Sequence, residues 1–129
     1  MQSGLYIVGT PIGNLSDMSP RAIETLQNVD LIAAEDTRVF GKLAAHFDIK
    51  TKRVSCHEHN ERDVVADLIE KIQNGMAVAC VSDAGMPCIS DPGYLLVQRL
   101  IEQNIEYTVI PGACAFVTAF VLSGFEAPF

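Results

Sequence analysis

The segment that decides the fold is "MAVACVSDAGMPCISDPGY", residues 76–94. Its first part, 76–82, is apolar almost throughout, which is typical of a β-strand covered on both faces. Residues 83–93 then hold two Asp, two Gly and two Pro. A surface turn needs only about two to five residues, so a constrained loop of this length calls for another explanation. Glycines that allow close approach and prolines that stiffen the path favour a rigid loop shaped to a flat, polar-edged ligand such as adenosine.

Strand-like and helix-like segments alternate on both sides of this loop. The runs that read as β-strands are 4–9, 29–34, 52–56, 76–82 and 106–110. Helices are expected over 20–27, 36–47, 60–75 and 94–103, with a last one ending near residue 123. Strands that alternate with helices pair in parallel through right-handed crossovers. The sequence therefore predicts an α/β domain with a five-stranded, mainly parallel sheet covered by helices on both faces.

Several helix boundaries carry local signals. Ser19 is placed to cap a helix whose first residue is Pro20. Asn60 is predicted to cap the most strongly periodic helix, and Gly75 to end it. The helix over 36–47 is predicted to bury three apolar side chains spaced by four, Val39, Leu43 and Phe47.

Composition limits the class of protein. The chain of 129 residues fits one domain, with 49% apolar and 19% charged residues. A formal charge of −7 disfavours nonspecific binding of nucleic acid by this chain alone. Neither a signal peptide nor an apolar run near the ~20 residues of a membrane span is visible. The four cysteines lack CxxC spacing, so we expect reduced thiols in a cytoplasmic protein.

Ligands of open parallel sheets bind beyond the carboxyl ends of the strands. The five segments at that edge are "GTPIGN", "EDTR", "CHEHNE", "SDAGMPCISDPG" and "PGACA". All of them carry Gly, Pro or polar residues, and together they are predicted to surround a single cleft.

Two common ligand motifs are disfavoured. The first loop, from Gly9 to Gly13, is not GxGxxG, and Pro11 removes a backbone N–H that a phosphate cradle would use. Cys56, His57 and His59 resemble metal ligands, but no second cluster has matching spacing, and no metal is predicted.

The segment "EDTR" has two interpretations. Asp36 is suited to cap the following helix while Arg38 pairs with a nearby Glu, which would be a purely structural role. Alternatively, these residues supply a general base and a clamp for phosphate or carboxylate.

Taken together, "GTPIGNLSDMSPRA", "AEDTR", "HEHNE", "VSDAGMPCISDPG" and "PGACA" resemble the tetrapyrrole (corrin/porphyrin) methylase superfamily. Within it they are similar to the ribosomal small-subunit methyltransferase I group. The resemblance implies a homodimeric, two-domain enzyme that uses S-adenosyl-L-methionine (SAM) to 2′-O-methylate a cytidine of 16S ribosomal RNA in the small subunit. This chain would be its N-terminal domain, 1–129, with the C-terminal domain absent and the isolated fragment inactive.

By motif matching, the resemblance places the SAM contacts on three loops, at Pro11, Ile12, Ala84, Gly85, Met86, Ile89, Cys114 and Ala115. The group usually has Thr where Met86 stands and Ser where Cys114 stands, so two side-chain hydroxyls are missing. The candidates for the catalytic base are Glu35, Asp36, His57 and Glu58. The candidates for contact with RNA are Arg38, Lys42, His59 and Asn60.

Two alternatives remain open. One keeps the superfamily but methylates a tetrapyrrole ring carbon; against it, the tetrapyrrole enzymes typically carry GxGPGD where this chain has "GTPIGN". The other is a non-catalytic module that supplies half of a ligand site and a dimer interface. For the RNA enzyme, the negative charge is acceptable if the remaining half is basic or if the assembled subunit is recognised by shape.

Overall fold

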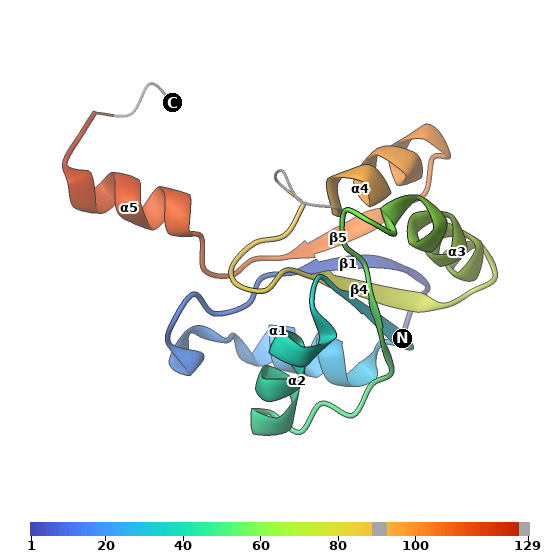
Figure 1. The fold of residues 1–129 in the computed structure, drawn as a ribbon, viewed down its shortest axis with the longest axis horizontal. Coiled ribbons are helices and arrows are strands. Elements are labelled where there is room, and N and C mark those ends of the chain that lie inside the picture. Colours follow the sequence, from blue (N-terminus) through green and yellow to red (C-terminus); the bar gives the residue numbers. More distant parts are fainter. Residues whose placement is uncertain (89–92, 127–129) are drawn as a thin grey trace.

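A computed structural model describes residues 1–88 and 93–126 of the chain. Strands and helices alternate as predicted (Figure 1). The strands are β1 (Gly4–Val8), β2 (Leu31–Ala34), β3 (Arg53–Ser55), β4 (Ala77–Val81) and β5 (Tyr107–Ile110). The helices are α1 (Pro20–Asn28), α2 (Thr37–His46), α3 (Glu61–Gln73), α4 (Gly93–Glu102) and α5 (Ala115–Ser123), with a short 3-10 turn, η1 (Leu15–Asp17).

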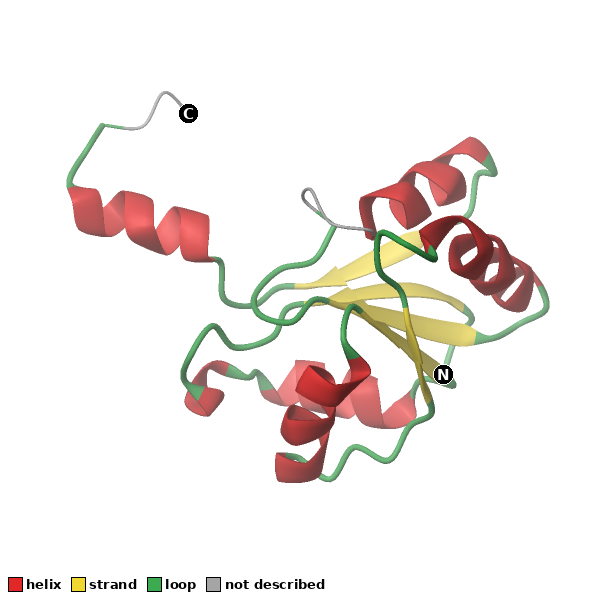
Figure 2. Cartoon of the chain, viewed as in Figure 1, coloured by secondary structure: helices red, strands yellow, loops and turns green. Residues whose placement is uncertain are grey.

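The five strands form one sheet in the order β3-β2-β4-β1-β5, and every pair of neighbours is parallel. Helices α1 and α2 cover one face, and α3 and α4 cover the other (Figure 2). The predicted fold class is confirmed. In a parallel sheet all carboxyl ends lie on one edge, so each of the five strands leads into its loop at that edge.

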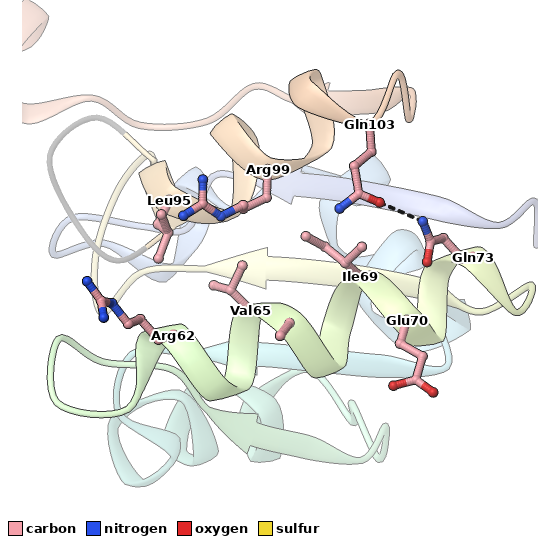
Figure 3. Close-up of a pocket in the computed structure, with 9 residues that line it drawn as sticks. Arg62, Val65, Ile69, Glu70, Gln73, Leu95, Arg99 and Gln103 are labelled. Carbon is pink, nitrogen blue, oxygen red and sulfur yellow. Dashed lines mark hydrogen bonds between the residues drawn. The ribbon is translucent and has the colours of Figure 1, made fainter.

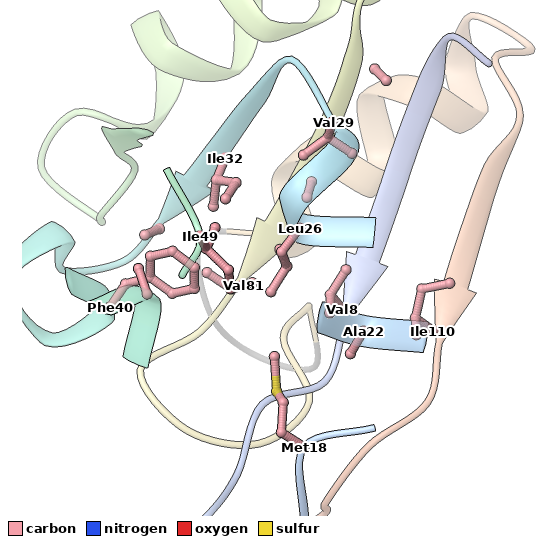
Figure 4. Packing of buried hydrophobic residues seen from close by; sticks show 14 residues of the cluster. Val8, Met18, Ala22, Leu26, Val29, Ile32, Phe40, Ile49, Val81 and Ile110 are labelled. Atoms are coloured by element: carbon pink, nitrogen blue, oxygen red, sulfur yellow. The ribbon is translucent and has the colours of Figure 1, made fainter. Parts of the chain in front are cut away.

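The central strand β4 is buried along its whole length, as its apolar sequence predicted. Its side chains alternate between the two faces. Ala77, Ala79 and Val81 join the cluster under α1 and α2 (Figure 4), whereas Val78 and Cys80 join the cluster under α3 and α4. Burying each large aliphatic side chain in such a cluster stabilises the fold by roughly 1.5–3 kcal/mol.

The predicted helix boundaries at Ser19 and Gly75 are confirmed. The Ser19 hydroxyl accepts from the Ala22 N–H at 3.0 Å, and Pro20 occupies the first helical position. Gly75 has φ +101°, follows the C-cap residue Asn74 of α3, and donates to the Ile72 carbonyl at 3.0 Å. A left-handed residue is the usual way to satisfy the last carbonyls of a helix.

The predicted apolar face of α2 is wrong by one position. Phe40 and Ala44 are the buried residues, whereas Val39 is exposed, and Leu43 and Phe47 only flank the core. The buried pair has the same spacing of four as the predicted one, shifted by one residue, which turns the buried face by about 100° around the helix axis. The core under this helix is therefore centred on Phe40 (Figure 4).

The prediction that the Asn60 side chain caps α3 is also wrong. Asn60 does occupy the position before α3, but its side chain makes no hydrogen bond to the helix. It accepts instead from the His57 N–H at 2.9 Å and donates to the Ser55 carbonyl at 3.1 Å. Asn60 therefore closes the loop that precedes the helix.

Helix α5 differs from the other helices because it stands away from the sheet (Figure 1). None of its residues is buried, although the sequence is almost entirely apolar. Among the described residues, no helix combines the length and apolar character needed to cross a bilayer.

Candidate functional site

The loops after β1 and β4 are joined at the carboxyl edge of the sheet by a two-residue bridge. Thr10 and Gly85 exchange both backbone hydrogen bonds at 3.0 Å, and the Thr10 hydroxyl lies 3.4 Å from the Gly85 carbonyl. Ser82 supports the same turn by donating to the Ala84 carbonyl at 3.0 Å. Thr10 is only 2% exposed. Its role in joining the two loops was not predicted, because its bonding partner lies 75 residues away.

Glycines bring the loop after β5 into the same cluster. A Cβ atom on Gly9 would lie 2.7 Å from both Cα and N of Gly112 and 2.7 Å from the sulfur of Met86. Gly85 has φ +81°, and a Cβ there would lie 3.1 Å from Ile12 Cγ2 and 3.2 Å from the Ala113 carbonyl. Side chains at Gly9 or Gly85 would force the loops apart, so glycine is required for this convergence.

Around this glycine cluster lie seven of the eight residues predicted to contact SAM. Pro11 is buried, Met86 and Cys114 are half-buried, and Ile12, Ala84 and Ala115 are exposed, while Gly85 forms the bridge. Ile89 lies outside the described residues. The surface of the cluster is thus small or apolar side chains between closely spaced backbones. Apolar side chains beside exposed backbone groups are the usual lining of small-molecule sites.

The loop after β2 is bonded to the loop after β4 through the Asp83 carboxylate. The backbone N–H of Asp36 donates to Oδ1 of Asp83 at 3.2 Å. Asp36 itself caps α2 by accepting from the Arg38 N–H at 2.9 Å, as predicted. Arg38 pairs with Asp36 at 3.3 Å, where the sequence had suggested a Glu as its partner.

The Arg38 side chain lowers the pKa of Asp36 through its hydrogen bond, and the Arg38 backbone N–H acts in the same direction. Both oxygens of Asp36 are therefore engaged. A carboxylate with a lowered pKa is a weaker base, so the structural role of Asp36 accounts for its geometry.

The loop after β3 holds two histidines in contact. The rings of His57 and His59 are edge to face with centroids 5.7 Å apart. The His59 N–H donates to Nδ1 of His57 at 3.2 Å. In neutral His57 the proton must then be on Nε2, so this nitrogen can donate a hydrogen bond but not accept a proton.

The two groups of predicted residues are not in one place. The SAM candidates gather on the loops after β1, β4 and β5, whereas His57, Glu58 and His59 follow β3 at the far edge of the sheet. Two strand spacings of roughly 4.8 Å separate β3 from β4. Glu35 follows β2 and lies between the groups. Lys42 lies one helical turn beyond Arg38 on α2, and both are exposed.

Away from this edge, the outer surface has a groove of about 490 Å³ between α3 and α4 (Figure 3). Arg62, Leu95 and Arg99 line one end, and the other is closed by a 2.7 Å hydrogen bond between Gln73 and Gln103. Its lining contains none of the predicted site residues. A groove of ligand size does not by itself identify a functional site. The loop cluster around Gly9, Gly85 and Gly112, with its close backbone contacts, is the better candidate for a binding site.

Metal chemistry receives no support from the described part of the chain. Within residues 1–88 and 93–126, no three His, Cys, Asp or Glu side chains are arranged to hold a metal ion.

Solved structures share the arrangement of strands and loops. The chain superposes on uroporphyrin-III-C-methyltransferase from Thermus thermophilus with a TM-score of 0.71 at 22% identity, covering 98% of this chain and 54% of that one. It superposes on a diphthine synthase with a TM-score of 0.74 at 18% identity, covering 96% and 50%. At these identities the likeness defines the fold, which is that of an α/β methylase domain.

The sequence itself identifies the family. The sequence model of the family Tetrapyrrole (Corrin/Porphyrin) Methylases matches residues 4–128, and the chain belongs to that family. It is 58% identical over 120 residues to ribosomal RNA small subunit methyltransferase I of Synechocystis sp., covering 93% of this chain and 43% of that protein. It is 51% identical over 125 residues to the protein of the same name from Mycoplasmopsis pulmonis, covering 97% and 56%. The chain thus spans about half the length of these relatives.

Proposed function

We propose that this chain forms the SAM-binding half of a methyltransferase that acts on the 2′-hydroxyl of a cytidine in 16S ribosomal RNA, within the small subunit. The observation that carries the proposal is the convergence of three loops on Gly9, Gly85 and Gly112 at the carboxyl edge of the sheet. The names of relatives at 51–58% identity support the choice of RNA as substrate.

SAM, when bound, supplies a methyl group made electrophilic by the attached sulfonium. The chain's own residues then have two tasks, to align the ribose oxygen and to take up its proton. The SAM that the loops around Gly9, Gly85 and Gly112 would hold would give up its methyl group and keep the C–S electron pair as a neutral thioether. Alignment is worth the most, because a well-oriented displacement avoids about 7–11 kcal/mol of entropic barrier.

Glu35 is our choice for the base. Asp36 has a lowered pKa and is therefore a weaker base, and His57 follows the edge strand β3. Glu58 lies on the loop after the edge strand β3, whereas Glu35 follows β2, which pairs directly with β4 and so adjoins the SAM candidates. His57 is then suited to donate from Nε2 to the RNA.

Arg38 and Lys42 are proposed to contact RNA phosphate. They are one turn apart on α2, and the Arg38 side chain is 91% exposed despite its pair with Asp36. Contacts of this kind fix position and do not read sequence. His59 is exposed and remains a candidate for the same surface. Asn60 is proposed to hold the loop of His57 and not to bind RNA, since both ends of its amide are bonded within the loop.

A tetrapyrrole substrate is the second candidate, and the uroporphyrin-III-C-methyltransferase neighbour raises it. At 22% identity that neighbour supports the fold alone. The relatives that are more than 50% identical are named as ribosomal RNA enzymes. The third candidate is a non-catalytic half-site. It would apply to the isolated chain if that chain binds S-adenosylhomocysteine but transfers no methyl group.

Transfer of a labelled methyl group tests the proposal. The full gene product that contains this chain would be incubated with radiolabelled SAM and with either undermethylated small subunits or uroporphyrinogen III. The proposal predicts label in 16S RNA, at one nucleotide that resists alkaline cleavage because its 2′-oxygen is blocked. Label in the tetrapyrrole alone would contradict it. Replacing Glu35 by Gln should slow transfer at least about 100-fold if Glu35 is the base.

We also propose a homodimer that covers α5. This helix exposes Phe116 (64%), Val121 (75%) and Leu122 (82%), and large exposed apolar patches mark interaction surfaces. The double variant Val121→Glu, Leu122→Glu should convert a dimer of the full gene product into a monomer in sedimentation experiments, and Gln2→Glu should not. If the wild-type full gene product sediments as a monomer, the proposed dimer is contradicted, and α5 would have to be covered by another part of the same molecule. We place the enzyme in the cytoplasm, where its ribosomal substrate is.

A further inference from the structure

Asp83 connects two loops that belong to different parts of the proposed site. Its Oδ1 accepts the backbone N–H of Asp36 at 3.2 Å, across 47 residues of sequence. Asp36 precedes the first residue of α2, so its N–H has no acceptor within the helix. Asp83 is followed directly by Ala84 and Gly85, which belong to the SAM candidates. Beside the β2–β4 ladder, which pairs Ala34 with Val81, this exposed carboxylate thus adds a bond between the Glu35–Asp36 segment and the proposed cofactor loop.

The same connection continues toward β3. The Ser55 hydroxyl donates to the Glu35 carbonyl at 3.1 Å, and Asn60 then bonds both the Ser55 carbonyl and the His57 N–H. On the other side, Gly85 is bonded to Thr10 through both backbone groups. Side-chain hydrogen bonds therefore join the loop after β3 to the loop after β2 and that loop to the one after β4, and backbone hydrogen bonds join the loop after β4 to the one after β1. Among the described residues, Asp83 supplies a side-chain link between the half that carries Glu35 and His57 and the half that carries the glycine cluster.

Such a link matters more for alignment than for stability. Asp83 is exposed, and hydrogen bonds at an exposed site contribute little to folding because water replaces them. Alignment is far more sensitive, since a displacement of about 1 Å can lower a rate roughly 100-fold. Loss of the Asp83 acceptor should therefore slow the reaction without unfolding the domain.

We propose that Asp83 is a positioning residue for methyl transfer, which holds the Glu35–Asp36 segment in register with the cofactor loop. The inference rests on the proposed function. It assigns Asp83 no contact with SAM or RNA, so its replacement should affect the rate of transfer and not the affinity for the cofactor product. The acceptor matters and not the charge, so Asp83→Asn, which retains a side-chain oxygen, should retain the function.

The hydrogen bond is tested first, on the chain itself. In the NMR spectrum, the Asp36 amide proton of Asp83→Ala should move upfield and lose protection from hydrogen exchange, while Asp83→Asn keeps both properties. Asp63→Ala, which removes another exposed carboxylate from α3, is the matched control and should leave the Asp36 amide unchanged. An Asp36 amide that is identical in wild type and Asp83→Ala would overturn the proposal.

Function is tested in the full gene product by single-turnover methyl transfer to small subunits at saturating SAM. Asp83→Ala should be slower by about tenfold or more, with the dissociation constant for S-adenosylhomocysteine changed less than threefold. Asp83→Asn and Asp63→Ala should stay within threefold of wild type. Equal rates for Asp83→Ala and wild type, or an equal loss in Asp83→Asn, would overturn the positioning role. A wild type that transfers no methyl group would instead refute the proposed function.

Discussion

The close approach of Gly9 and Gly112 can be tested by adding one methyl group. In Gly9→Ala the new Cβ would lie 2.7 Å from Cα and N of Gly112 and 2.7 Å from the sulfur of Met86. The Met86 side chain can move aside, but the Gly112 backbone can move only if the loop after β5 shifts. The variant therefore reports on the contact between the loops after β1 and β5.

The size of the effect follows from two opposing contributions. Overpacking costs typically 1–3 kcal/mol, and contact with a backbone belongs near the upper end, about 3 kcal/mol. Replacing Gly by Ala lowers the entropy of the unfolded chain, which offsets about 0.4–1 kcal/mol. The net loss in the free energy of unfolding should be about 2 kcal/mol. Gly112→Ala should cost a similar amount, because its Cβ would lie 2.9 Å from the Gly9 backbone.

Urea unfolding followed by circular dichroism measures these losses. The midpoint should fall in each single variant while the slope with urea stays constant. The double variant should lose less than the sum, since the loops need to separate only once. Gly41→Ala, within α2 and with no atom within 4 Å of the new Cβ, is the control and should gain about 0.5–1 kcal/mol. A Gly9→Ala protein as stable as Gly41→Ala would refute the contact.

Two further predictions concern side chains that bond to the backbone. Asp30→Ala should lower the free energy of unfolding by about 2 kcal/mol, because Asp30 Oδ2 accepts the N–H of the buried Ala77 at 2.8 Å. In the same urea experiment Asp30→Asn, which keeps an acceptor, should lose less than half as much stability. The carbon-detected titration of Asp36 should show a pKa below that of an ordinary aspartate, and Arg38→Ala should raise it. Because this pKa is lower in the folded state, the stability that Asp36 contributes is present at neutral pH and is lost as the pH falls through the folded-state pKa. A pKa that Arg38→Ala leaves unchanged would contradict the assigned cause.

Much of the fold follows from local patterns in the sequence. The apolar run of β4 and the Ser19 and Gly75 signals predicted elements that the structure confirms within a few residues. The order of the strands was not predicted, since alternation of strands and helices fixes parallel pairing but not which strand is central. The error in α2 arose because Ala44 contributes little to an apolar pattern although it lies in the core.

The site was predictable as a set of loops but not as a set of bonds. Motif order indicated which residues lie at the carboxyl edge, and the described ones lie on the loops at that edge. The partners of Thr10, Asp83 and Asn60 were missed. The contacts of Thr10 and Asp83 span 75 and 47 residues, so no local pattern encodes them. For Asn60, a side chain that can bond forward to a helix or backward to a loop gives the same sequence signal in both cases.

The central claim is that the glycine-lined loop cluster binds SAM. Its most direct test is a calorimetric titration of the full gene product with S-adenosylhomocysteine, with NADH as the control ligand. The account predicts saturable binding of S-adenosylhomocysteine at one site per chain, weakened in Gly112→Ala, and no heat from NADH. Saturable binding of NADH, or no binding of S-adenosylhomocysteine to the folded full-length protein, would contradict it.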